Sequence, residues 1–334
     1  MSTKASSDKL LFLNRGDLIS TFTPERVMKK VKESMEIYMS GKILMPERLS
    51  ATYAGQTIVC MPAFTPNACG NKILTVTPSN IERHLPSIYG LMVVNDAVTG
   101  RPKGIFDGGA FTAIRTGAIG CGVALNILAP AQAHTLGLIG CGAQGYYHVI
   151  YACTVREIDT VYLFNTPKID LSKFIRGCKE DLKRFGVTRE ITFTVCESAV
   201  SAVRDAEIIV TTTTAPTPVL PDDKTLFEGK TVIGVGSYQP HTRELPDALF
   251  GPDTAVFVEI EFAMEEAGEL AIPIKNGLVK KEDVHLILEA EKDPSLKKKT
   301  NFFKTVGMAL YDVVVGDDIF DAAVEKNLGQ YIML

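Results

Sequence analysis

A glycine-rich segment, TLGLIGCGAQGYYHV at residues 135–149, constrains the fold of this chain more than any other feature. An apolar run ends at Gly140, and Gly142 and Gly145 complete the spacing G-x-G-x-x-G before a helical pattern begins. The first glycine permits a tight turn, the second lets the backbone approach a pyrophosphate, and the third lets helix and strand pack closely. The phosphates would lie at the helix N-terminus, where unpaired N–H groups and the helix dipole favour anions. We therefore predict a cofactor site at Gly140, Gly142, Ala143, Gln144 and Gly145.

The segments around this loop predict a parallel sheet, because strand-like and helical patterns alternate from residue 134 onward. The strand-like segments are residues 134–140, 160–165, 191–196, 207–214 and 231–237, with helical segments at 170–186 and 199–206. Such alternation favours an α/β fold with a Rossmann-type, doubly wound parallel sheet, the context in which G-x-G-x-x-G indicates dinucleotide binding. The alternative is a glycine-rich turn that binds no ligand.

The first hundred residues predict a different arrangement, with one amphipathic helix at residues 24–40 in front of a sheet of mixed or antiparallel strands. The strand-like segments there are residues 57–64, 71–78 and 88–96. Residues 109–128 then predict a helix rich in small residues, and residues 300–327 predict a long helix followed by another.

Length and charge restrict the class of protein. A chain of 334 residues is long enough for two domains. The 35 basic and 39 acidic residues give a net charge of −4, which provides no electrostatic footprint for nucleic acid or an anionic membrane. No uninterrupted apolar run reaches the roughly 18 residues that a membrane-spanning helix needs, and the N-terminus does not read as a signal peptide. We expect a cytoplasmic protein that binds neither nucleic acid nor membrane.

The seven cysteines are scattered and lie in apolar contexts, and no pair has C-x-x-C spacing. This pattern is typical of reduced thiols that serve as small core residues. The five histidines do not cluster with the cysteines, so we predict no metal site.

The end of the second strand of the alternating region bears on the choice between NAD and NADP. An acidic residue there would bind the ribose hydroxyls of NAD, but the sequence reads YLFNTPK, without a carboxylate. Asn165, Thr166 and Lys168 could hold a 2′-phosphate, although no arginine is present. The sequence therefore favours NADP over NAD modestly, and the alternative is that these are ordinary turn residues.

Three cations in the first part of the chain are candidates for binding an anionic substrate. Arg115 lies inside an otherwise apolar helical segment, where a buried guanidinium must be paired. It could form a structural ion pair, or it could hold a substrate carboxylate bidentately. Lys72 and Arg48 could each be surface charges, but together with a cofactor domain they indicate an anionic substrate.

Six segments, in order along nearly the whole chain, carry a family resemblance. They are LMPER near residue 48, GNK at 70–72, GLMVVNDAVTGRPKGIFDGGAFTAIRTGA at 90–118, LGLIGCGAQG at 136–145, RELPD at 243–247 and FFKTVGMALYD at 302–312. They resemble the ornithine cyclodeaminase/μ-crystallin family. The resemblance implies a smaller α+β substrate-binding and dimerisation domain, residues 1–124 plus 306–334, into which a Rossmann domain at 125–305 is inserted. It also implies a homodimer.

The resemblance further implies roles for individual residues. Arg48, Lys72 and Arg115 would contact the substrate, with Lys72 and Arg115 as catalytic residues, and Ser87 would line the pocket. Thr116 would contact a cofactor phosphate, Thr214 would lie near the nicotinamide ribose, and Thr305 to Gly307 would lie close to the nicotinamide.

One departure from the family bears on the reaction. True ornithine cyclodeaminases carry an aspartate six residues before the glutamate of the E-L motif, where this chain has Tyr238 before Glu244. The pattern resembles the ketimine reductase branch more closely. It implies an NAD(P)-dependent oxidoreductase acting on the C–N bond of a small amino or imino acid, an imine reductase or an amino acid dehydrogenase. The alternatives are a cyclodeaminase that uses NAD catalytically and a non-catalytic, crystallin-type NADP-binding protein.

The mechanism implied by this resemblance is hydride transfer, with Lys72 relaying a proton to or from the substrate nitrogen. Arg48 and Arg115, if close, would lower the pKa of Lys72 towards neutrality.

Overall fold

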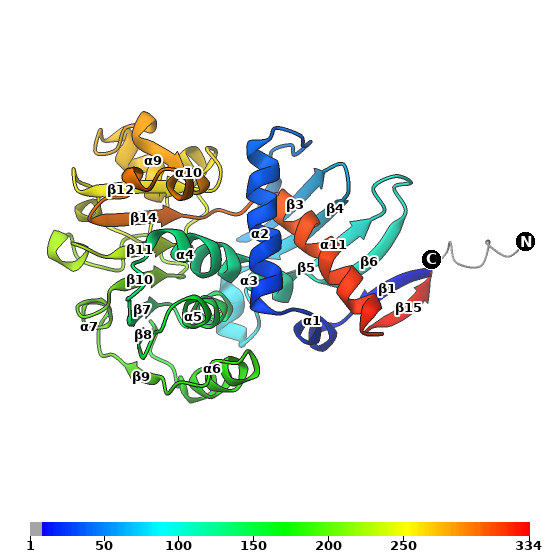
Figure 1. Cartoon of the computed structure of the whole chain (residues 1–334), viewed down its shortest axis with the longest axis horizontal. Coiled ribbons are helices and arrows are strands. Elements are labelled where there is room, and N and C mark those ends of the chain that lie inside the picture. Colours follow the sequence, from blue (N-terminus) through cyan, green and yellow to red (C-terminus); the bar gives the residue numbers. More distant parts are fainter. Residues whose placement is uncertain (1–8) are drawn as a thin grey trace, which may run out of the picture. The chain divides into compact units, whose positions relative to one another are not determined.

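The computed structural model describes residues 9–334, and the chain divides into two compact units. The first unit contains the chain up to Arg115 together with Met308–Leu334, and the second contains Thr116–Gly307. Each unit has its own sheet (Figure 1). The sequence predicts boundaries after residues 124 and 305. The roles predicted for the two domains stay predictions.

A seven-stranded mixed sheet forms the first unit. In spatial order its strands are β15 (Gln330–Met333), β1 (Lys9–Leu13), β6 (Pro102–Asp107), β5 (Ile88–Asn95), β4 (Cys69–Val76), β3 (Gln56–Phe64) and β2 (Leu49–Tyr53). The β1–β6 pair is parallel, and the other pairs of this sheet are antiparallel. The strands predicted at 57–64, 71–78 and 88–96 correspond to β3, β4 and β5.

Helices cover one face of this sheet. Helix α11 (Ala309–Glu325) packs on β3, β4 and β5, and α2 (Pro24–Met39) packs beside it (Figure 1). The Thr23 hydroxyl caps the start of α2, and Pro24 occupies its first turn, where a missing N–H costs nothing. The buried face of α2 carries Val27, Val31 and Met35, as the amphipathic pattern predicts. The short helix α1 (Arg15–Thr21) packs on α11 and β6, and a 3₁₀ turn, η1 (Pro78–Arg83), lies between β4 and β5 in the chain.

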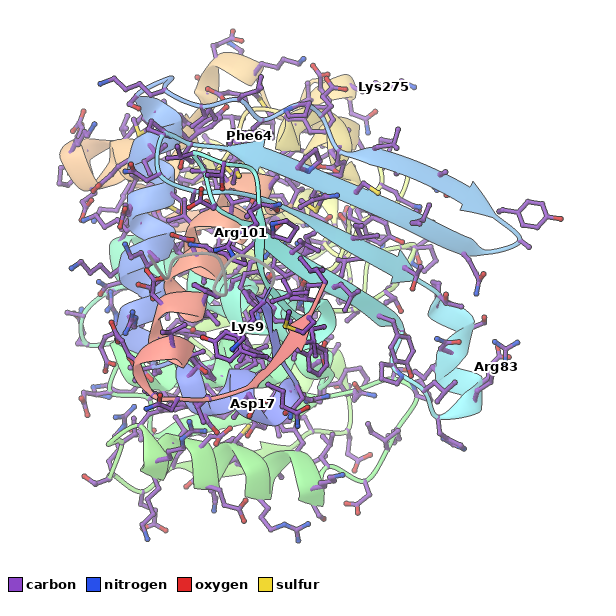
Figure 2. The ribbon with its side chains drawn as sticks, turned by 90° about the vertical axis from the view of Figure 1, so that its right-hand side faces the viewer. Lys9, Asp17, Phe64, Arg83, Arg101 and Lys275 are labelled. Atoms are coloured by element: carbon purple, nitrogen blue, oxygen red, sulfur yellow. The ribbon has the colours of Figure 1, made fainter. Side chains whose placement is uncertain are left out.

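The opposite face of the sheet exposes apolar side chains. Ile58 on β3, Ile73 on β4, and Tyr89 and Leu91 on β5 share this face through the cross-strand register, and all four are exposed. Phe64, labelled at the end of β3 in Figure 2, has the same parity as Ile58 and is half exposed. An antiparallel sheet commonly leaves one face to water, but that face is then normally polar.

An eight-stranded parallel sheet forms the second unit. In spatial order its strands are β13 (Val284–Leu286), β12 (Thr254–Val258), β14 (Thr300–Lys304), β11 (Thr231–Gly234), β10 (Ile208–Thr211), β7 (Thr135–Ile139), β8 (Thr160–Phe164) and β9 (Thr192–Val195). All neighbouring pairs are parallel. The run β9-β8-β7-β10-β11 has the doubly wound order 3-2-1-4-5. The predicted fold class, a Rossmann-type sheet with a further α+β sheet, is confirmed.

Helices connect these strands. They are α5 (Ala143–Val155), α6 (Ser172–Arg184), α7 (Ala199–Val203), α8 (Ala263–Glu266), α9 (Gly268–Lys275) and α10 (Ile287–Lys292), with short turns η3 (Lys224–Leu226), η4 (Asp247–Leu249), η5 (Lys281–Asp283) and η6 (Pro294–Leu296). The α5 and α6 helices pack on each other, and a buried apolar cluster that includes Ile139, Val232 and Phe302 fills this unit.

The helix predicted at 109–128 exists, but it changes pitch. It comprises α3 (Gly108–Gly117), a π-helical stretch η2 (Ala118–Ala124) and α4 (Leu125–Leu128). By length and composition the run Gly108–Leu128 could cross a membrane, and 89% of its most apolar window is buried within the protein. The core helices of globular proteins pass the same test.

The prediction of two helices over residues 300–327 is wrong. Residues Thr300–Lys304 form strand β14, a single helix, α11, follows, and the chain ends in strand β15. All five residues of β14 are buried. A strand that is buried on both faces has no alternating pattern, so periodicity cannot separate it from a buried helix.

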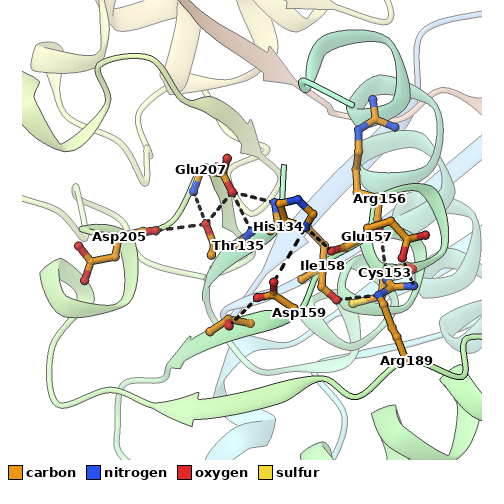
Figure 3. A network of polar contacts seen from close by, with 11 residues as sticks. His134, Thr135, Cys153, Arg156, Glu157, Ile158, Asp159, Arg189, Asp205 and Glu207 are labelled. Atoms are coloured by element: carbon orange, nitrogen blue, oxygen red, sulfur yellow. Dashed lines mark hydrogen bonds and ion pairs between the residues drawn. The ribbon is translucent and has the colours of Figure 1, made fainter. Parts of the chain in front are cut away.

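Polar contacts around His134 and Thr135, drawn in Figure 3, fix the amino end of β7. The carboxylate of Glu207 accepts the backbone N–H groups of His134 (2.7 Å) and Thr135 (3.1 Å). Arg189 donates to the carbonyl oxygens of Arg156 (2.7 Å) and Ile158 (2.9 Å) and so holds the segment between α5 and β8. These contacts therefore hold the residues that precede β7 and β8. The glycine loop follows the opposite, carboxyl end of β7.

Candidate active site

The glycine loop of the second unit has the geometry that the spacing predicts. Gly140 directly follows β7 and has φ of +100°, which side chains disfavour. A Cβ on Gly145 would lie 2.2 Å from the carbonyl oxygen of Gly140, so only glycine allows α5 to approach the strand this closely. A Cβ on Gly142 would meet nothing within 4 Å, and no side chain caps the N-terminus of α5 there. The loop therefore presents open backbone at a helix N-terminus, which fits a pyrophosphate.

Neighbouring side chains hold this loop. The N–H of Cys141 donates to Oδ1 of Asn165 (2.8 Å), whose Nδ2 donates to the carbonyl oxygen of Pro167 (2.9 Å). The Thr212 hydroxyl donates to the carbonyl oxygen of Gly140 (2.6 Å). Asn165, predicted as a 2′-phosphate ligand, thus binds the glycine loop through Oδ1 and its own turn after β8 through Nδ2. Oε1 of Gln144 is buried and has no hydrogen-bond partner among residues 9–334, so a ligand could complete its bonding.

The turn after β8 brings together two exposed, oppositely charged side chains. Lys168 forms an ion pair with Glu197, which comes from the turn after the neighbouring strand β9. Glu197 was not predicted, because it follows β9 and not β8, where an acidic residue was expected for NAD. The pair reduces the positive charge that Lys168 can offer to a 2′-phosphate. Thr166, also predicted here, lies in the same turn.

The remaining predicted cofactor residues of the second unit differ in exposure. Thr214 lies after β10 and is exposed, whereas Thr305 and Gly307, after β14, are buried, as is Thr116 at the start of the unit. Oε1 of Glu259 accepts the Thr305 hydroxyl (2.9 Å) and the N–H of Gly307 (2.6 Å). The conformation of the segment 305–307 is therefore set by a buried carboxylate at the end of β12.

A buried cluster of charged side chains lies in the first unit. Lys72 on β4, Arg115 on α3 and Asp312 on α11 come from three different elements. Nζ of Lys72 donates to Oδ1 of Asp312 (2.9 Å), and Nε of Arg115 lies 3.1 Å from the same oxygen. The side chains of Lys72 and Asp312 are fully buried, and Arg115 is 4% exposed. The structure thus joins the two predicted catalytic residues through one carboxylate.

When Lys72 is protonated, the cluster has more positive than negative charge. Two cations share the single carboxylate of Asp312, and Arg48 is close enough to act on Lys72 electrostatically. Burial, assisted by the charges of Arg115 and Arg48 and opposed by Asp312, lowers the pKa of Lys72 from 10.5 to about 7. The direction agrees with the prediction from sequence, but the largest cause is burial rather than the two arginines.

Such a cluster is suited to an anionic ligand and to proton transfer. A buried excess of positive charge is costly unless an anion compensates it, and a lysine with a pKa near neutrality can both give and take a proton. Lys72 is buried and is therefore not a surface charge, and Arg115 forms the ion pair with Asp312 that was one of its two predicted roles. Their role in binding substrate stays a prediction.

Comparisons with known proteins identify the family of this chain. Residues 11–327 match the model of the ornithine cyclodeaminase/mu-crystallin family. This chain belongs to that family, and the resemblance inferred from its motifs is confirmed. A Δ1-pyrroline-2-carboxylate reductase of Bacillus cereus is 32% identical over 97% of this chain and 99% of its own length.

Two solved structures share the fold over nearly the whole chain. The Thermococcus litoralis Δ1-pyrroline-2-carboxylate reductase in complex with NADH and L-proline is 26% identical, with a TM-score of 0.84 over 96% of this chain and 99% of its own. An archaeal alanine dehydrogenase dimer with bound NAD is also 26% identical, with a TM-score of 0.85 over 98% and 99%.

Two further observations concern predicted and missed residues of the first unit. Ser87 lies half-buried in the turn before β5, and within the described part of the chain no hydrogen bond joins it to Lys72, Arg115 or Asp312. Asp312 was missed as a site residue. The sequence feature that could have indicated Asp312 is a single carboxylate in the apolar segment ALYDVVV. A charge on the buried face of a helix must be paired.

Proposed function

We propose that this chain is a nicotinamide-dependent reductase of small imino acids, which reduces a C=N bond next to a carboxylate. The observation that carries the proposal is the buried Lys72–Asp312–Arg115 cluster, with its excess positive charge and a lysine of pKa about 7. The names of the related reductases and the alanine dehydrogenase support the same reaction class.

The chain's own residues would bind the substrate and supply the proton. Arg115, with Arg48, binds the substrate carboxylate, and this fixes the orientation of the C=N group. Nζ of Lys72 donates a proton to the imine nitrogen, because the iminium form is the better hydride acceptor. Asp312 holds Nζ in place, and it keeps the pKa of Lys72 from falling further.

The glycine loop would hold the cofactor pyrophosphate on the N-terminus of α5. When bound, the reduced nicotinamide supplies the hydride. We propose that NADPH is accepted as well as NADH, because β8 ends without a carboxylate and Thr166 and Lys168 lie after it.

A homodimer is part of this proposal. The exposed face with Ile58, Ile73, Tyr89 and Leu91 is apolar, and a second copy of this chain would remove it from water. The alanine dehydrogenase of the same fold is a dimer.

The test is a substrate screen with the purified chain. Δ1-Pyrroline-2-carboxylate, other cyclic imino acids, and 2-keto acids with ammonia are offered with NADH or NADPH, and absorbance of the reduced nicotinamide is followed. We expect net cofactor oxidation with at least one cyclic imino acid. Turnover of ornithine to proline and ammonia without net cofactor consumption would contradict the proposal, as would an absence of turnover with every substrate.

A further inference from the structure

A second buried charge network lies at the carboxyl ends of β10, β11 and β14 in the second unit. Glu244 accepts the Thr211 hydroxyl at the end of β10 (3.0 Å) and the N–H of Gly236 after β11 (2.6 Å). Glu269 accepts the N–H of Leu245 (3.2 Å) and the Ser237 hydroxyl. The network thus ties together the segments that follow these two strands.

The third member of this network is Lys304, the last residue of β14. Its Nζ lies 3.7 Å from Oε2 of Glu269 and has no hydrogen-bond partner among the described residues. Glu244, Glu269 and Lys304 are all fully buried. The network therefore holds two carboxylates and one ammonium group, and its net charge is negative when all three are ionised. Burial raises the pKa of Glu269, the charge of Lys304 opposes this, and the charge of Glu244 adds to it.

The strand order places this network in the half of the sheet that would bind the nicotinamide end of a dinucleotide. In a sheet of order 3-2-1-4-5 the ligand lies outside the carboxyl ends of the strands, and the adenosine ribose belongs to the half that begins with the glycine loop. That half is β7, β8 and β9 here, so β10, β11 and β14 belong to the half that takes the nicotinamide.

The nicotinamide ring is positively charged when oxidised and neutral when reduced. A fixed charge buried at the carboxyl ends of these strands therefore changes the affinities for the two forms by different amounts, whereas a contact that only shapes the site changes both affinities alike. In general, two unit charges about 12 Å apart at an effective dielectric constant of about 20 interact by about 1.4 kcal/mol, which corresponds to roughly tenfold in a ratio of dissociation constants.

We propose that the network of Glu244, Glu269 and Lys304 sets the relative affinity of the chain for the oxidised and the reduced cofactor, an inference that rests on the dinucleotide function proposed above. Its excess negative charge favours the oxidised form, which is the cofactor product of imine reduction. Glu269 is the member to vary, because its glutamine isostere keeps Oε1 for the backbone N–H groups of residues 244 and 245.

The experiment measures dissociation constants, so it does not depend on turnover. NADH binding is followed by its fluorescence, and NAD⁺ binding by competition against NADH. The variants are Glu269→Gln, Lys304→Met and the double variant, which restores the charge balance. The control is Glu265→Gln, which removes a carboxylate from an exposed pair with Lys281 (3.0 Å) in the same unit.

We expect the ratio Kd(NAD⁺)/Kd(NADH) to differ between the variants according to the charge that each one removes. It rises about tenfold in Glu269→Gln, falls by a similar factor in Lys304→Met, and stays near the wild-type value in the double variant and in the control. If Glu269→Gln fails to fold, Lys304→Met still tests the inference, because it alone is expected to lower the ratio about tenfold while the control leaves it unchanged.

Two results overturn the inference in distinguishable ways. If the variants change both dissociation constants together and leave the ratio at its wild-type value, the network only shapes the site, and the dinucleotide function stands. If the wild-type chain binds neither NADH nor NAD⁺, the proposed function fails and this inference fails with it.

Discussion

Replacing Arg115 with alanine tests the substrate site most directly. The side chain is 4% exposed and Nε lies 3.1 Å from Asp312, so the guanidinium is held in a desolvated setting. Loss of a charge-assisted contact to a substrate carboxylate there costs about 2–5 kcal/mol of transition-state binding, or roughly 30- to 5,000-fold in kcat/KM. We expect Arg115→Ala to lower kcat/KM for an imino acid within this range and to change the Kd for NADH far less.

The same substitution has a second, independent consequence. Arg115 is one of the groups that lower the pKa of Lys72, so its removal raises that pKa. If protonated Lys72 is the acid in the reaction, activity falls as pH rises through its pKa, and the basic limb of the pH profile should move to higher pH in the variant.

Steady-state kinetics over a range of pH measures both effects. Arg115→Lys is the conservative comparison, because it keeps the charge and loses the bidentate geometry, and an intermediate kcat/KM is expected. Arg176→Ala, which removes an exposed arginine from α6, controls for loss of a positive charge in general. A folded Arg115→Ala variant that reduces imino acids as well as the wild type would refute the reasoning.

Four other expectations can be checked separately. Gly145→Ala should weaken NADH and NADPH binding more than tenfold in fluorescence titrations, because the new Cβ would lie 2.2 Å from a loop carbonyl oxygen. Stability against urea should rise between about pH 7 and 10 in the wild type more than in Lys72→Met, since in that window Lys72 binds a proton in the unfolded chain but not in the folded one. Because Tyr238 stands where cyclodeaminases have aspartate, ammonia release from ornithine should be negligible in a coupled assay. Ile73→Glu should shift sedimentation from dimer to monomer without unfolding the chain, because the side chain lies on the exposed apolar face of the sheet.

The sequence predicts well those parts of the site whose residues lie close together in the chain. Gly140, Gly142 and Gly145 lie within six residues, and the steric reason for each glycine follows from the spacing of the motif and its position between a strand and a helix. The alternation of strands and helices likewise predicts the parallel sheet, because each βα unit carries its own pattern.

The parts that sequence does not predict depend on distant pairs. Lys72 and Asp312 are 240 positions apart, and nothing in the spacing of either residue indicates the other. Glu197 pairs with Lys168 from the turn that follows the neighbouring strand β9. Asn165 has the right chemistry for a phosphate ligand, but its amide holds the glycine loop, because tertiary contacts decide which partner a side chain takes.

The electrostatics of the two units are suited to opposite charges. In the first unit, Lys72 and Arg115 outnumber Asp312, so this cluster favours a carboxylate. In the second, Glu244 and Glu269 outnumber Lys304, so that network favours a positively charged ring. Imine reduction consumes an imino acid that carries a carboxylate and forms an oxidised, positively charged nicotinamide. The excess charge of the first unit therefore favours binding of the imino acid, and that of the second favours the oxidised nicotinamide formed when the imino acid is reduced. The pKa of Lys72, about 7, makes its proton available for this reaction at neutral pH.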